Sequence, residues 1–228
     1  MTRLLQTSSS FLALALLATN LSAGIITGIG DGFNIPDNNT AGTTSEIVIT
    51  ENETVTDVEV TLSGFNHTWA GDLTATISNG TVTSSLVTRV GDPGGTSGDS
   101  SAYGGDYTFS SDGGDLWSAA AGAGFGEVIP VGDYKPTGVN DSAVSLSSDF
   151  SGQSSAGTWT LFMSDVAQGD TGAISGWSIQ LTTSGGTGGA SSPVPEPGSM
   201  TVFAVGIGVA CVIRRRRRPT RVGGDLRR

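Results

Sequence analysis

Residues 158–164 read Thr-Trp-Thr-Leu-Phe-Met-Ser, and large apolar side chains recur at every second position. Successive side chains of an extended strand point to opposite faces, so Trp159, Leu161 and Met163 share one face. A strand with one such face needs a second layer of structure to bury it. The stretch therefore predicts one strand of a β-sandwich whose apolar face is turned toward the opposite sheet.

The same alternation recurs along the chain, while helical periodicity is nearly absent. The other segments that show it are Glu46–Thr50, Val55–Leu62, Asp72–Ser78, Ser84–Val90, Asp106–Ser110, Ala143–Ser147 and Ala173–Leu181. Together they predict an all-β fold of eight strands. Eight strands fit a jelly-roll β-sandwich, although the pattern alone leaves the topology open.

Glycine supplies 35 of the 228 residues, about twice the usual ~7%. Such a content favours many turns between short strands. Two Gly/Ser/Ala-rich stretches, Gly91–Ala102 and Gly113–Gly126, contain few large apolar side chains. We expect both to form long surface loops.

The two ends of the chain have the composition of targeting segments. Residues 1–23 join Arg3 to a short apolar run and end on small residues, which is typical of a signal peptide removed by signal peptidase. Near the other end, the apolar run Met200–Ile213 predicts a single C-terminal transmembrane helix. Five arginines follow it and are expected to stop transfer and to stay in the cytoplasm: Arg214, Arg215, Arg216, Arg217 and Arg218.

The triplet Pro195, Glu196 and Pro197 precedes the apolar run. Triplet, short apolar helix and arginine cluster, in this order, closely resemble the bacterial PEP-CTERM sorting signal. The resemblance implies that an exosortase cuts near the triplet and that the body passes from the inner membrane to the cell surface or extracellular matrix. A permanent tail anchor is the alternative interpretation.

Charge is distributed unevenly between the body and the ends. Only Asp225 of the 21 acidic residues lies in the tail, and only Arg89 and Lys135 of the 11 basic residues lie in the body, which leaves the body with 20 acidic and two basic residues. Such a field repels phosphate backbones and argues against a nucleic-acid partner. The single cysteine, Cys211, lies in the apolar tail, so the body is expected to fold without a disulfide.

Four motifs in the body follow one another in a familiar order. They are His67-Thr68-Trp69-Ala70-Gly71-Asp72-Leu73, Asp106-Tyr107-Thr108-Phe109, Gly132-Asp133-Tyr134-Lys135-Pro136, and Gly157-Thr158-Trp159-Thr160-Leu161 followed by Asp165, Gly169-Asp170-Thr171-Gly172 and Trp177. This order resembles the P/Homo B domain that follows the catalytic domain of kexin-like and furin-like proteases. The resemblance implies a jelly-roll fold, with His67, Trp69, Gly71, Trp159 and Trp177 as structural positions of the family.

The predicted organisation of the chain has six parts. They are a signal peptide (1–23), an N-terminal lead-in (24–42), a P/Homo B-like β-sandwich domain (43–183), a Gly/Ser/Thr linker (184–193), a PEP-CTERM signal (194–218, with the membrane span at 200–213) and a cytoplasmic basic tail (219–228).

Catalytic residues are scarce in this sequence. A Ser-His-Asp hydrolase needs a histidine base, and His67 is the only histidine of the chain. The segment Gly98-Asp99-Ser100-Ser101 has a superficial likeness to a trypsin-like nucleophile segment but lies in a glycine-rich loop. We therefore expect His67 to be a structural residue and the protein not to be an enzyme.

Calcium is the metal that the acidic body favours, because it prefers oxygen ligands. The predicted ligands are Asp72, Asp106, Asp112, Asp165 and Asp170. Carbohydrate is a further candidate, since Tyr103, Tyr107, Trp117 and Phe125 lie in or beside the predicted long loops. The preferred interpretation is that Trp117 and Phe125 anchor their loop onto the sandwich.

Two classes of function remain. One is a noncatalytic surface or matrix protein that acts in adhesion or with exopolysaccharide. The other is an accessory domain for a subtilisin/kexin-like serine endopeptidase encoded elsewhere, to which the body would dock. Exosortase and signal peptidase are the expected processing partners in both cases.

Overall fold

The computed structural model describes residues 23–185. Outside these residues lie residues 1–22 of the predicted signal peptide, the linker beyond residue 185, the sorting signal and the basic tail. Within the described part, no helix combines the length and the apolarity that a membrane crossing requires. The predicted span at 200–213 lies outside that part.

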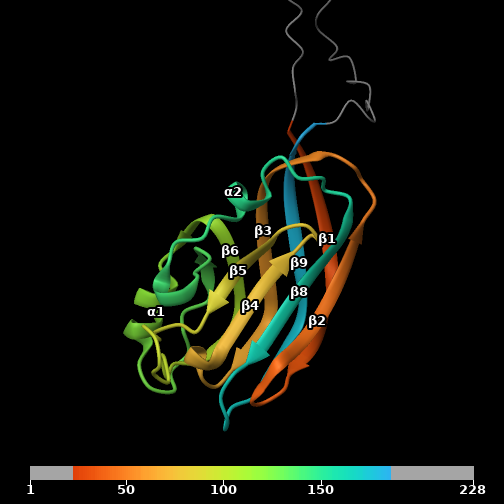
Figure 1. Ribbon diagram of the computed structural model, residues 1–228. Coiled ribbons are helices and arrows are strands. Elements are labelled where there is room, and N and C mark those ends of the chain that lie inside the picture. The colour runs from red at the N-terminus through yellow and green to blue at the C-terminus, as the bar shows by residue number, and fades with distance from the viewer. Residues whose placement is uncertain (1–22, 186–228) are drawn as a thin grey trace, which may run out of the picture. The chain divides into compact units, whose positions relative to one another are not determined.

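Within residues 23–185, nine strands form two sheets, drawn as two layers in Figure 1. Their bounds are β1 Ala23–Ile35, β2 Asn39–Ile49, β3 Thr54–His67, β4 Leu73–Ser78, β5 Thr83–Thr88, β6 Tyr103–Gly114, β7 Gly132–Tyr134, β8 Gly157–Asp165 and β9 Gly172–Ser184. One sheet has the order β1-β9-β3-β6-β7 and the other the order β2-β8-β4-β5. All pairings are antiparallel except that of β6 with β7.

The two sheets share one hydrophobic core, which confirms the all-β fold. The predicted inward face of β8 is fully buried, with Trp159, Leu161 and Met163 all at 0% exposure. Across the core lie the alternating apolar residues of β3 and β9, including Leu62 and Ile179. Period-two patterning therefore identified which side of each central strand faces inward.

Strand register brings distant segments together at one end of the sandwich. His67, at the end of β3, is paired with Gly172 at the start of β9. In the opposite sheet Leu73, at the start of β4, is paired with Asp165 at the end of β8. The turns that follow β3 and β8 consequently meet at this end, where the candidate site lies.

The predicted N-terminal lead-in 24–42 contains most of β1 and the start of β2, and the strand prediction placed no strand in it. The glycines of this segment suggested turns, but Gly28 and Gly30 lie within β1 and allow it to pack closely against β2 and β9. A Cβ at Gly30 would lie 2.1 Å from Trp177 Nε1, and one at Gly28 would lie 2.4 Å from a methyl group of Ile47. Glycine is required here by contact rather than by chain reversal.

The predicted strand Ala143–Ser147 is also wrong. Residues 146–150 form the short helix α2 (Leu146–Phe150), whose N-cap Ser145 accepts a hydrogen bond from Ser148 N. Leu146 and Phe150, four residues apart, are both buried on one side of this helix. The segment was too short for periodicity to separate a strand from a helical turn.

The predicted loop Gly113–Gly126 contains the helix α1 (Leu116–Ala123). Asp115 caps α1 by accepting from Ser118 N, while Leu116 and Ala120 are buried beneath it. Two short 3-10 helices, η1 (Ala70–Asp72) and η2 (Val139–Asp141), complete the described elements.

Candidate functional site

His67 and Asp165 form a buried pair between the two sheets. The distance from His67 Nε2 to Asp165 Oδ2 is 3.1 Å, and both side chains are fully buried. The other ring nitrogen, Nδ1, lies 3.0 Å from Trp69 O, and Asp165 Oδ1 accepts from Ala167 N at 2.9 Å. The pair thus fixes the turn after β3 and the turn after β8 to each other.

Asp72 lies beside this pair, at the last position of η1. Its side chain is 3% exposed, and its Oδ1 atom is buried with no hydrogen-bond partner. Burial is the main cause that raises the pKa of the Asp72 carboxyl to about 6, and the nearby carboxylates of Asp165 and Asp170 raise this pKa further. The ionised form of Asp72 is therefore less stable in the folded protein than in water.

Asp170, in the turn before β9, completes a group of three carboxylates. Its Oδ1 atom accepts from the Thr68 hydroxyl at 2.6 Å. The structure thus brings together three of the predicted calcium ligands, Asp72, Asp165 and Asp170, all at one end of the sandwich. Within residues 23–185, however, no three His, Cys, Asp or Glu side chains are disposed to hold a metal ion.

The other two predicted ligands lie on β6 and do not join this group. Asp106 is exposed and accepts from Gly64 N at 2.7 Å. Asp112 is exposed six residues further along the same strand. The five aspartates therefore do not form a single centre, and any cation beside Asp72 would need backbone oxygens and water as additional ligands.

Arg89 was not among the predicted site residues, although its rarity in the acidic body was a usable signal. Its Nε donates to Gly71 O at 3.0 Å and its Nη2 to Thr96 O at 2.8 Å. Its Nη1 lies 2.7 Å from Asp92 Oδ2. The guanidinium is thereby held rigidly between η1 and the glycine-rich loop that follows β5.

Trp69 and Phe125 form an aromatic pair at the surface. Trp69 is partly exposed, and its indole Nε1 donates to Ser97 O at 2.7 Å. The ring of Phe125 meets Trp69 in a T-shaped contact, with 6.0 Å between centroids. Phe125 is 80% exposed, so the prediction that it anchors its loop onto the sandwich is wrong; Trp117, in contrast, packs against the core.

A pocket of about 500 Å³ opens between these groups, and we call it the Trp69 pocket. Three segments build it: η1 with the residue before it, the loop after β5, and the turn between β8 and β9. Its polar and aromatic lining comes chiefly from Trp69, Asp72, Arg89, Thr96, Gln168 and Asp170. These segments thus present two carboxylates, one guanidinium group and one indole ring to the pocket.

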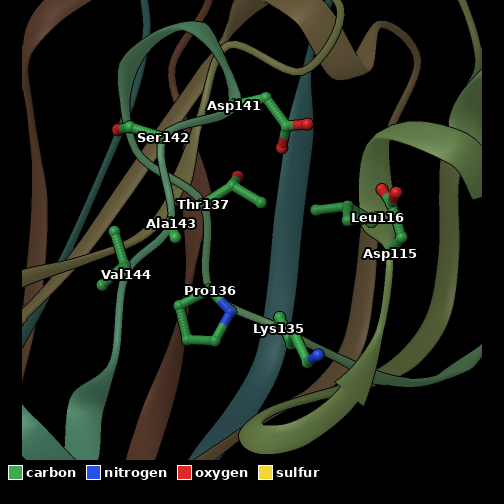
Figure 2. A pocket seen from close by; sticks show the side chains of 9 residues that line it. All are labelled: Asp115, Leu116, Lys135, Pro136, Thr137, Asp141, Ser142, Ala143 and Val144. Carbon is green, nitrogen blue, oxygen red and sulfur yellow. The ribbon is translucent and has the colours of Figure 1, made fainter.

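A second, smaller pocket of about 250 Å³ lies between α1 and η2 and is shown in Figure 2. Asp115 and Lys135 lie on one side and Asp141 on another, around Thr137, whose buried Oγ1 has no hydrogen-bond partner. Burial, and then the charge of Asp115, raises the pKa of Asp141. Leu116 and the apolar atoms around it give this pocket a more apolar lining than that of the Trp69 pocket.

The remaining residues of the family motifs lie at packing positions. Trp159 is fully buried and donates from Nε1 to Ser155 O, and Trp177 donates from Nε1 to Ser45 Oγ. Gly71 passes so close to the next loop that a Cβ there would lie 2.4 Å from Ser97 O. The sorting residues Pro195, Glu196 and Pro197, and the five arginines, lie outside the described part.

Two family models match this chain. The model described as the PEP-CTERM protein-sorting motif matches residues 193–218. The model of the proprotein convertase P-domain matches residues 129–181, which include β7, β8 and most of β9. The chain therefore combines a PEP-CTERM sorting motif with a P-domain module, as the sequence resemblance indicated. The sorting motif implies export and a membrane-anchored precursor that an exosortase processes.

Similar solved structures include the serine protease of Aeromonas sobria, alone and in complex with its chaperone. The complex is 18% identical with a TM-score of 0.41 and covers 72% of this chain; the protease alone is 17% identical with a TM-score of 0.41 and covers 70%. A structure of infectious bursal disease virus, Gt strain, is 13% identical with a TM-score of 0.31 and covers 72%. The chain spans only 28%, 27% and 33% of these three chains, respectively. A search of curated proteins finds no match.

Proposed function

We propose that this protein is a noncatalytic binding module of the cell surface or extracellular matrix, exported as a membrane-anchored precursor and sorted by an exosortase. The observation that carries the proposal is the sorting motif at 193–218. It is joined to a body whose one histidine, His67, is buried and hydrogen-bonded. A precursor of this kind delivers its folded body to the outer side of the membrane.

The environment of His67 supports a noncatalytic role. A general base must reach the proton it abstracts, whereas His67 is 1% exposed. Its two ring nitrogens are engaged by Asp165 and by the backbone of Trp69. A substrate would have to displace this buried pair before it could meet the imidazole.

Strand order supports the jelly-roll assignment that we propose for the body. The orders β1-β9-β3-β6 and β2-β8-β4-β5 place four strands in each sheet, as expected for a jelly roll built from two Greek keys. The short strand β7 then extends one edge of the first sheet.

Processing of the tail can be tested directly. In the native host we expect the mature protein to lack the segment after Pro197, and deletion of the exosortase to leave the full-length form in the inner membrane. Mass spectrometry of the C-terminus in each cell fraction provides the measurement. An intact C-terminus in the surface fraction would support a permanent tail anchor instead.

Accessory action on a protease is the second candidate, and the P-domain match at 129–181 is the observation that favours it. P domains follow a protease domain, so this body would dock on a protease encoded elsewhere. Pull-down of surface proteases with the purified protein, compared with binding to matrix polysaccharide, separates the two candidates.

A further inference from the structure

We propose that the Trp69 pocket binds neutral saccharide chains, with Trp69 as the stacking surface and Asp72, Asp170 and Arg89 as partners of the sugar hydroxyls. This inference deepens the proposed surface function by naming the ligand class, and it rests on that function for its biological setting. The binding itself can be measured independently of export and sorting.

The first support is that the pocket is built in advance. Trp69 is held by its bond to Ser97 O, Asp170 by the Thr68 hydroxyl, and Arg89 by three contacts with other segments. Side chains fixed before binding lose little conformational entropy when a ligand arrives. A pocket of about 500 Å³ also falls within the size range of ligand sites.

The second support is the presence of two carboxylates, Asp72 and Asp170, in the lining of the pocket. Asp72 is almost fully buried and its Oδ1 atom is shielded from solvent, whereas Asp170 is partly exposed. Asp170 is therefore the carboxylate that a ligand reaches most readily. A sugar offers hydroxyl groups as donors along one edge of its ring, so it can donate to a carboxylate at the surface of the pocket.

The third support comes from Arg89 and Trp69. A guanidinium has five N–H donors, and the contacts of Arg89 within the described part use three of them. The remaining donors are available to sugar oxygens. Trp69 adds an aromatic surface edged by the exposed ring of Phe125, and the C–H groups of a pyranose ring can pack on the electron-rich face of an indole.

Charge decides which saccharides fit. Asp72 and Asp170 line the pocket and Asp165 lies buried near Asp72, while the charge of Arg89 is opposed by Asp92. The whole body is strongly acidic as well. Uronate polymers and other anionic glycans are therefore repelled, so the pocket selects neutral chains.

Isothermal titration of the full chain tests the proposal. The protein is purified in a non-glycosidic detergent with a chelator present, and it is titrated with cellohexaose, mannohexaose, chitohexaose and hexagalacturonate. We expect at least one neutral hexasaccharide to bind with a Kd below about 1 mM. Hexagalacturonate is expected to bind at least about tenfold more weakly. Failure of all three neutral probes, or a preference for hexagalacturonate, overturns the proposal.

Matched variants locate the binding. Trp69→Ala and Asp170→Asn are expected to weaken binding of the neutral chain by about tenfold. Gln168→Ala is expected to do the same, because its exposed side chain lines the pocket. Asp112→Asn removes the same charge from an exposed position of β6 and should leave Kd unchanged. If Gln168→Ala and Asp170→Asn fold with unchanged melting temperatures and bind like the wild type, the site is wrong. A failure in sorting would leave these measurements unaffected, whereas a failure here would leave sorting unaffected.

Discussion

At the residue scale, His67 and Asp165 form a buried pair between the two sheets. Both side chains are removed from water and lie 3.1 Å apart. Removing one partner of such a pair leaves the other polar group buried without compensation. The imidazole therefore stabilises the fold through Asp165 rather than through its own packing alone.

His67→Ala is expected to lower the free energy of unfolding by about 3 kcal/mol, because Asp165 stays buried without its partner. Urea unfolding monitored by circular dichroism provides the measurement. In a cycle with Asp165→Asn, the two effects should not add. An unchanged stability together with loss of a measured hydrolytic activity would contradict the structural role.

Asp72 predicts a pH dependence of stability. Its carboxyl has a pKa of about 6 in the folded protein against an ordinary value of 3.8. The folded state therefore binds the proton more tightly, so the stabilisation is complete below about pH 4 and is lost as the pH rises through about 6. Asp72→Asn should remove this slope and, after allowance for solvent screening, stabilise the protein at pH 7 by about 1–2 kcal/mol. Thermal melts from pH 4 to pH 8 check this, and Asp112→Asn, which should keep the slope, is the control.

The structural role of His67 stays a prediction from the sequence, whereas its partner could not be predicted at all. His67 is the only histidine of the chain, which left no base for a catalytic dyad elsewhere. Asp165 lies 98 residues away, and only the pairing of β3 with β9 and of β8 with β4 brings it to the imidazole. Contacts of this kind depend on topology, which alternation does not determine.

At the element scale, β1 shows that glycine inside a strand can be needed for close packing. The glycines of β1 face the side chains of β2 and β9, and the indole of Trp177 occupies the space beside Gly30. Sequence patterning assigned strands by side-chain alternation, so it missed a strand in which glycines take the inward positions. The same patterning mistook the capped turn of α2 for a strand, because five residues do not define a period.

Gly30→Ala is expected to destabilise the protein by about 2 kcal/mol, because its Cβ would lie 2.1 Å from Trp177 Nε1. The matched control is Gly122→Ala in α1, where a Cβ meets no atom within 4 Å. This control should be neutral or stabilising by up to about 1 kcal/mol. Chemical denaturation of both variants compares them, and equal stabilities would rule out close packing as the reason for Gly30.

At the scale of the whole molecule, charge and architecture act together. The body carries 20 acidic and two basic residues, and this excess destabilises the compact state through self-repulsion. The three carboxylates of Asp72, Asp165 and Asp170 concentrate that repulsion at one end of the sandwich. Added cations should therefore weaken this repulsion and stabilise the folded protein.

Calcium binding remains a prediction and can be separated from simple screening. At matched ionic strength, calcium chloride is expected to raise the melting temperature more than sodium chloride does, because specific binding adds stability in proportion to the logarithm of ligand concentration. At 100 times the Kd the gain would be about 2.7 kcal/mol. The Asp72→Asn/Asp170→Asn double variant should lose the difference. Equal midpoints in the two salts for the wild-type protein would sink the prediction.

The position of β9 also determines how the body would carry a mechanical load. The Trp69 pocket lies next to the start of β9, and the chain leaves the sandwich at its other end, beside the start of β1 in Figure 1. A pull between a bound ligand and residue Ser184 would run along β9, which is hydrogen-bonded to β1 on one side and β3 on the other. Both ladders would then be strained in shear along their length, with many bonds sharing the force at once. Under such a load, β9 would not separate from its neighbours one bond at a time.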